Sequence, residues 1–143
     1  MKSRVYLTGL FFAACVVAEA VAFVGKPNCE ITEGWSVLQA NQENSFKAIY
    51  DLKADEVKLG KPFSFGVKIC GDEEKTPDRI TANAMMPAHQ HGMNYTPTVE
   101  VDEDSSTYRV SDFLFHMPGV WEITVSSYLD EDVTHFTQDI TIN

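Results

Sequence analysis

Pro62-Phe63-Ser64-Phe65-Gly66-Val67-Lys68-Ile69-Cys70 alternates apolar residues with polar or small ones over the length of one strand. On an extended chain the side chains at every second position share one face. The same period of two returns at residues 121–126 and again at 135–142. Each of these runs predicts a β-strand that has one face on a core and the other in water.

Shorter apolar runs, separated by residues that favour turns, predict the remaining strands. The expected strands are residues 46–53, 80–85, 97–101 and 108–115, and residues 33–42 are expected to form a short turn or helix. About seven short strands at this spacing predict an all-β fold, an antiparallel immunoglobulin-like β-sandwich. The length of the chain leaves room for one such domain.

The first twenty residues are predicted to be a secretory signal peptide. Lys2 and Arg4 precede an apolar run over residues 5–18, and small residues follow. Ala18-Glu19-Ala20 and Ala20-Val21-Ala22 both fit the pattern at which signal peptidase cuts. Cleavage after Ala20 or Ala22 predicts a periplasmic or otherwise exported protein.

The exported part, residues 21–143, is expected to be a single acidic domain. Its charge is −11, because removal of Lys2, Arg4 and Glu19 leaves nine basic and twenty acidic residues. This charge argues against nucleic acid and anionic lipid as partners. The alternative for the N-terminus is an uncleaved membrane anchor, since an apolar segment of this length can just span a bilayer.

Cleavage also removes Cys15 and leaves Cys29 and Cys70. Two cysteines in an exported chain most simply form one disulfide. Closing the loop between them contributes about 4 kcal/mol in a chain-entropy model. The alternative is that both cysteines ligate a metal ion.

Two short stretches hold three of the four histidines, each stretch with a methionine. They are His89-Gln90-His91-Gly92-Met93 and His116-Met117. On an extended backbone the side chains of His89 and His91 project to one side, with their Cβ atoms about 6.5 Å apart. His116 ends an expected strand, and loops at one end of a sandwich cluster in space. We therefore expect one metal site, with the ligands His89, His91, Met93, His116 and Met117.

Imidazole and thioether donors without a thiolate favour copper, as Cu(I) or Cu(II). Zinc, bound by the histidines alone, is the less favoured metal. His135 stands apart from both stretches and is not expected to take part. The chain is not expected to be an enzyme, because no serine or cysteine lies in a recognisable nucleophile context.

In these motifs the chain resembles the YtkA-like family of exported or membrane-anchored β-sandwich domains. That family is related in overall plan to FixH-like and CopC-like proteins. The resemblance rests on Met86-Pro87-Ala88-His89-Gln90-His91-Gly92-Met93 and on Phe115-His116-Met117-Pro118-Gly119-Val120-Trp121-Glu122. It extends more loosely over residues 46–142. It implies a role in copper handling or in the assembly of copper-containing respiratory enzymes, and Cys29 and Cys70 are not part of the family pattern.

Two functions remain open. The first is a periplasmic copper-binding protein that sequesters copper or delivers it, with the copper ion and a membrane-bound respiratory or copper-transport complex as partners. The alternative is a β-sandwich interaction module that binds no metal and docks on a membrane complex, because a fold does not fix a function.

Overall fold

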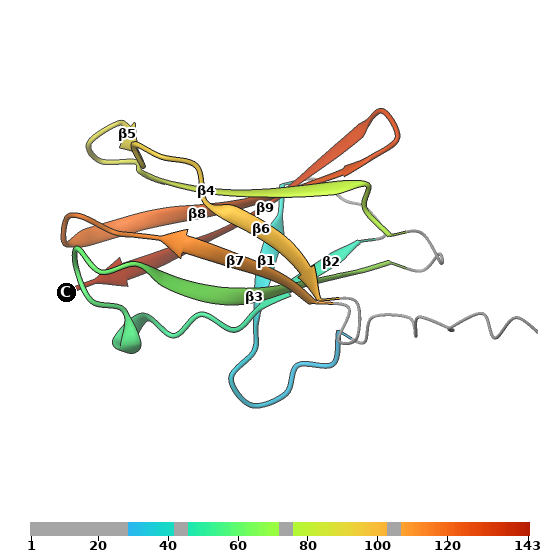
Figure 1. Cartoon of the computed structure of the whole chain (residues 1–143), viewed down its shortest axis with the longest axis horizontal. Helices are drawn as coiled ribbons and strands as arrows, with labels where there is room; N and C mark the ends of the chain where they lie inside the picture. The colour runs from blue at the N-terminus through green and yellow to red at the C-terminus, as the bar shows by residue number, and fades with distance from the viewer. Residues whose placement is uncertain (1–28, 42–45, 72–75, 103–106) are drawn as a thin grey trace, which may run out of the picture.

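The computed structural model describes residues 29–41, 46–71, 76–102 and 107–143 (Figure 1). The predicted signal peptide and both of its cleavage sites lie outside these residues. In the part of the chain that is described, no helix is long and apolar enough to cross a bilayer. Every pair of neighbouring strands is antiparallel, and the only helical element in the described ranges is a single 3-10 turn, η1 (Ala54–Glu56). The predicted all-β antiparallel fold is confirmed.

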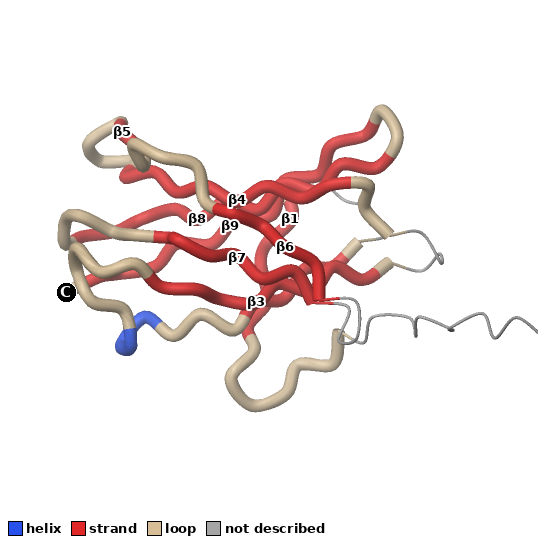
Figure 2. The backbone as a smooth tube through the Cα atoms, viewed as in Figure 1, coloured by secondary structure: helices blue, strands red, loops and turns tan. Residues whose placement is uncertain are grey.

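Nine strands form one sheet that curls into a half-barrel (Figure 2). Their order across the sheet is β5-β4-β8-β9-β1-β2-β3-β7-β6. In chain order the strands are β1 (Ser36–Ala40), β2 (Lys47–Tyr50), β3 (Phe63–Cys70), β4 (Arg79–Met86), β5 (His91–Gly92), β6 (Thr98–Asp102), β7 (Thr107–Phe113), β8 (Gly119–Leu129) and β9 (Asp132–Ile142).

Strand β1 joins the two halves of the curled sheet. Its first residues, Ser36–Leu38, pair with β2, and its last two, Gln39 and Ala40, pair with β9. Of the expected turn or helix over residues 33–42, a turn is present at Glu33 and Gly34, but Ser36–Ala40 is a strand. The segment has no clear alternation of its own, so its strand conformation depends on the two partners that tertiary structure supplies.

The core fills the concave side of the half-barrel. The alternating runs of β3, β8 and β9 bury their apolar faces, and Trp121 is fully buried, as predicted. The largest fully buried side chains are Trp121, Phe65, Phe113, Phe115, Phe136, Ile49, Met86, Ile123, Ile142, Val67, Val110 and Val125.

Cys29 and Cys70 form a disulfide. The predicted pairing is thus present, and neither thiol is free to ligate a metal. Cys70 is the last residue of β3, whereas Phe63 at the other end of that strand pairs with Phe113 of β7. The disulfide therefore lies at the opposite end of the sheet from the connection that carries His116.

The two histidine stretches come to the same end of the molecule. The turn between β4 and β5 carries His89, and the β7–β8 connection, residues 114–118, carries His116. Figure 1 shows the β4–β5 hairpin and the β7–β8 connection together at the left-hand end of the sheet, close to the C-terminus.

Candidate metal centre

His89 lies in a tight reversal of the chain between Met86 and His91. These two residues pair across β4 and β5, and the main-chain oxygen of Met86 accepts hydrogen bonds from the N–H groups of His89 at 3.1 Å and Gln90 at 2.9 Å. Gln90 closes the turn with a φ of 55°. The expected extended backbone from His89 to His91 is wrong, because Pro87 has no N–H with which to continue the ladder.

His91 faces the same side of the sheet as Met86, because directly paired residues of antiparallel strands share a face. Met86 is buried in the core, so the half-buried ring of His91 lies at the edge of that core. The next residue is glycine for a steric reason. A Cβ at Gly92 would lie 3.0 Å from the main-chain oxygen of Ala84, which also accepts the N–H of Met93 at 3.2 Å.

The β7–β8 connection is held in place through three of its main-chain oxygens. The hydroxyl of Tyr95 donates to the oxygen of Leu114 at 2.6 Å, and the N–H of Gly60 donates to that of Phe115 at 2.8 Å. The indole Nε1–H of Trp121 donates to the oxygen of Met117 at 3.0 Å. The donors come from three separate parts of the chain, so the backbone around His116 is fixed before any ligand binds.

These constraints bring three imidazole rings together, two of them against the indole of Trp121. The ring centroids of His91 and His116 are 5.4 Å apart, and those of His89 and His91 are 5.9 Å apart. Trp121 lies 6.0 Å from His91 and 5.3 Å from His116, nearly perpendicular to both rings. The two stretches, distant in sequence, are therefore neighbours in the fold.

The two predicted thioether ligands, Met93 and Met117, are half-buried and pack against the core. Among the described residues, no three His, Cys, Asp or Glu side chains are grouped so that they could hold one metal ion. The closest pair of imidazole rings among the described residues is His91 and His116.

His135 belongs to a different part of the structure. Its Nδ1 lies 2.8 Å from the hydroxyl of Ser126, and its main-chain oxygen accepts the N–H of Asn41 at 2.9 Å. Ser126 is five positions along β8 from Trp121, so this histidine is remote from the imidazole group.

Two residues of the site could not be identified from their sequence context. Trp121 was expected in the core, and its alternating strand supports only that role; its contact with two imidazoles depends on the fold. Tyr95 follows Met93 closely in sequence, but nothing in the sequence points to the main-chain oxygen of Leu114 as its partner. No family model matches this chain, and neither a curated protein nor a solved structure matches it.

Proposed function

We propose that this protein is an exported copper-binding protein that sequesters copper or delivers it to a membrane-bound complex. The proposed ligands are His91 and His116, and Met93, Met117 and His89 are the further ligands that the two sequence motifs suggest. The observation that carries the proposal is the 5.4 Å separation of the His91 and His116 rings. Two rings that share one ion through bonds of about 2 Å stand with their centroids about 6 Å apart.

The donor types favour copper over zinc. Thioether sulfur is a good ligand for Cu(I), and imidazole binds both oxidation states of copper. A structural zinc site needs four ligands drawn from Cys, His, Asp and Glu. Two imidazoles and a thioether therefore suit Cu(I) better than zinc.

The exposure of the donors suits exchange of the ion with a partner. His89 and His116 are exposed, and His91, Met93 and Met117 are half-buried. An ion at this position is reached from solvent, yet its apolar surroundings limit competition from water. The resemblance of the two motifs to YtkA-like domains supports the same function, with a respiratory or copper-transport complex as the partner.

Anaerobic titration with Cu(I) against a chromogenic chelator tests the proposal. We expect one ion per chain, and a loss of that binding in the triple variant H89A/H91A/H116A. His135→Ala is the matched control, because it removes an imidazole outside the group. Equal copper affinity in the wild type and the folded triple variant would refute the proposal.

The second candidate function is docking on a membrane complex without a metal ion. The observation that favours it is an unpaired stretch along one edge of β4. Ala84 and Met86 direct their main-chain groups toward β5, so by strand alternation Ala82 directs its N–H and C=O the same way. In the described part of the chain, no strand pairs with β4 at Ala82 on that side. Strand addition needs such an edge. Capture of a membrane complex that persists with a copper chelator present, and with the triple variant, would favour this candidate.

A further inference from the structure

We infer that Tyr95 is a positioning residue that holds the two ligand-bearing stretches in register; this inference rests on the proposed copper site. Its hydroxyl donates to the main-chain oxygen of Leu114 at 2.6 Å. Tyr95 lies two residues after Met93, and Leu114 lies two residues before His116. One hydrogen bond thus joins the segment that follows one predicted ligand to the segment that precedes another.

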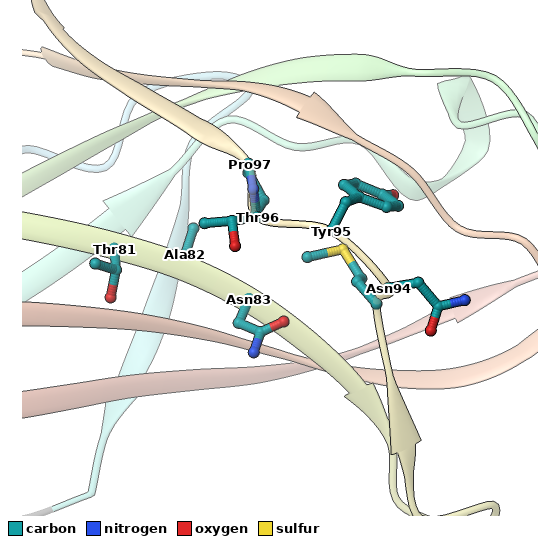
Figure 3. A pocket seen from close by; sticks show the side chains of 8 residues that line it. Thr81, Ala82, Asn83, Asn94, Tyr95, Thr96 and Pro97 are labelled. Carbon is teal, nitrogen blue, oxygen red and sulfur yellow. The ribbon is translucent and has the colours of Figure 1, made fainter.

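The chain on either side of Tyr95 has little other support. The N–H of Met93 bonds to the oxygen of Ala84, and within the described ranges no further main-chain hydrogen bond is made by residues 94–97. A pocket of about 440 Å³ separates this segment from β4 (Figure 3). It is lined by Thr81, Ala82, Asn83, Met93, Asn94, Tyr95, Thr96 and Pro97.

Figure 3 shows the ring of Tyr95 on the side of the segment that faces away from Asn83. The ring therefore does not fill the pocket, and the segment does not pack closely against β4. Space beside a segment allows it to shift when a tether is removed. The hydroxyl of Tyr95 is the tether that the structure offers between Met93 and the buried Pro97.

The two ligands that Tyr95 joins do not depend on it equally. The backbone around His116 keeps two other anchors, the Gly60 N–H on Phe115 and the Trp121 indole on Met117. Among the described residues, the main chain of Met93 makes one hydrogen bond, from its N–H to Ala84, although its side chain also packs on the core. Removal of the hydroxyl should therefore displace the Met93 thioether more than the His116 imidazole.

The hydroxyl acts through one neutral hydrogen bond to a main-chain oxygen. A neutral hydrogen bond contributes a net free energy of about 1 kcal/mol. Its loss should therefore weaken binding about three- to tenfold, and not abolish it.

The test compares Tyr95→Phe with Tyr108→Phe in the full exported domain. Tyr108 is half-buried, and its hydroxyl makes no hydrogen bond with the described residues, so it is the matched control. We expect Tyr95→Phe to lower the Cu(I) affinity three- to tenfold and Tyr108→Phe to leave it unchanged. In the Met93→Leu background, Tyr95→Phe should have no further effect, because it acts through that thioether.

A second measurement separates positioning from a general loss of structure. With Ag(I) as a diamagnetic probe for Cu(I), the methyl carbon resonances of Met93 and Met117 should both shift in the wild type. In Tyr95→Phe the Met93 shift should shrink while the Met117 shift is retained. If both shifts fall together, or if Tyr95→Phe binds as tightly as the wild type, the inference is wrong. If the wild type binds neither ion, the proposed copper site itself is wrong.

Discussion

The indole N–H of Trp121 donates a hydrogen bond to the main-chain oxygen of Met117 at 3.0 Å. Trp121 is fully buried in β8, and Met117 lies in the connection that leads into that strand. The same indole lies beneath the imidazoles of His91 and His116. One core side chain therefore contacts two of the predicted ligands, His91 and His116, and fixes the backbone next to His116.

Replacement of Trp121 by Phe should weaken both the fold and the site. The variant loses the donor to Met117 and leaves part of the indole volume empty, so we expect a loss of about 2 kcal/mol in the free energy of unfolding. Copper affinity should fall as the His116 backbone loosens. Urea denaturation and Cu(I) competition measure the two effects. Trp35→Phe is the control, because Trp35 packs on Lys68 and contacts none of the three imidazoles; equal losses in both variants would contradict the assignment.

Single histidine variants should separate into three groups. His91→Ala and His116→Ala should each weaken Cu(I) binding by more than about 100-fold. Loss of a residue that only hydrogen-bonds to a metal ligand typically lowers metal affinity 10- to 100-fold, and loss of the ligand itself should cost more. His89→Ala should have a smaller effect, because its ring lies in the turn and is near His91. His135→Ala should have none. Competition titration gives all four values, and a His135 effect as large as that of His116 would refute this order.

Gly119→Ala should be more harmful than Gly60→Ala. Both glycines have positive φ, of 130° and 67°, but their surroundings differ. A Cβ at Gly119 would lie 2.7 Å from the Cε of buried Met86, whereas at Gly60 it would meet open space. We expect a loss of about 1 kcal/mol at Gly60 and about 3 kcal/mol at Gly119, from strain combined with overpacking. Equal urea midpoints for the two variants would contradict this packing.

Removal of the disulfide should lower stability without changing the site. The bond closes a loop with a sequence separation of 41, so Cys29→Ser/Cys70→Ser should lose about 4 kcal/mol in the free energy of unfolding. The bond lies at the far end of β3 from the histidines. At a temperature where the variant is folded, its Cu(I) affinity should equal that of the wild type. A large fall in affinity of the folded variant would show that the two ends of the sheet are coupled.

Stability should fall as the pH rises above about 10. Burial raises the pKa of Tyr50, Tyr95 and Tyr108 in the folded protein. The unfolded chain therefore releases these protons first, which favours unfolding once the pH passes the ordinary phenol pKa. Below that pH the contribution is fully present. Urea midpoints from pH 8 to 11 measure the fall, which should be smaller in Tyr50→Phe and Tyr108→Phe than in the wild type.

The strands with strong alternation could be predicted from the sequence because a period of two has a direct physical meaning. Phe65, Val67 and Ile69 occupy one face of β3, and that face is buried whatever pairs with the strand. Strands β1 and β5 could not be predicted in this way. The first changes partners midway, and the second, His91–Gly92, is too short to show a period.

The sequence by itself determined the all-β class, the buried faces and the chemical types of the predicted ligands, because these depend on composition and local spacing. Only the tertiary structure decided that His116 would meet His91, because the pairing of β4 with β8 brings the β4–β5 hairpin beside the start of β8, where the β7–β8 connection ends. It also decided the anchors of the site. The bonds from Tyr95 and Trp121 end on main-chain oxygens, which every residue has, so no side-chain pattern marks them in advance.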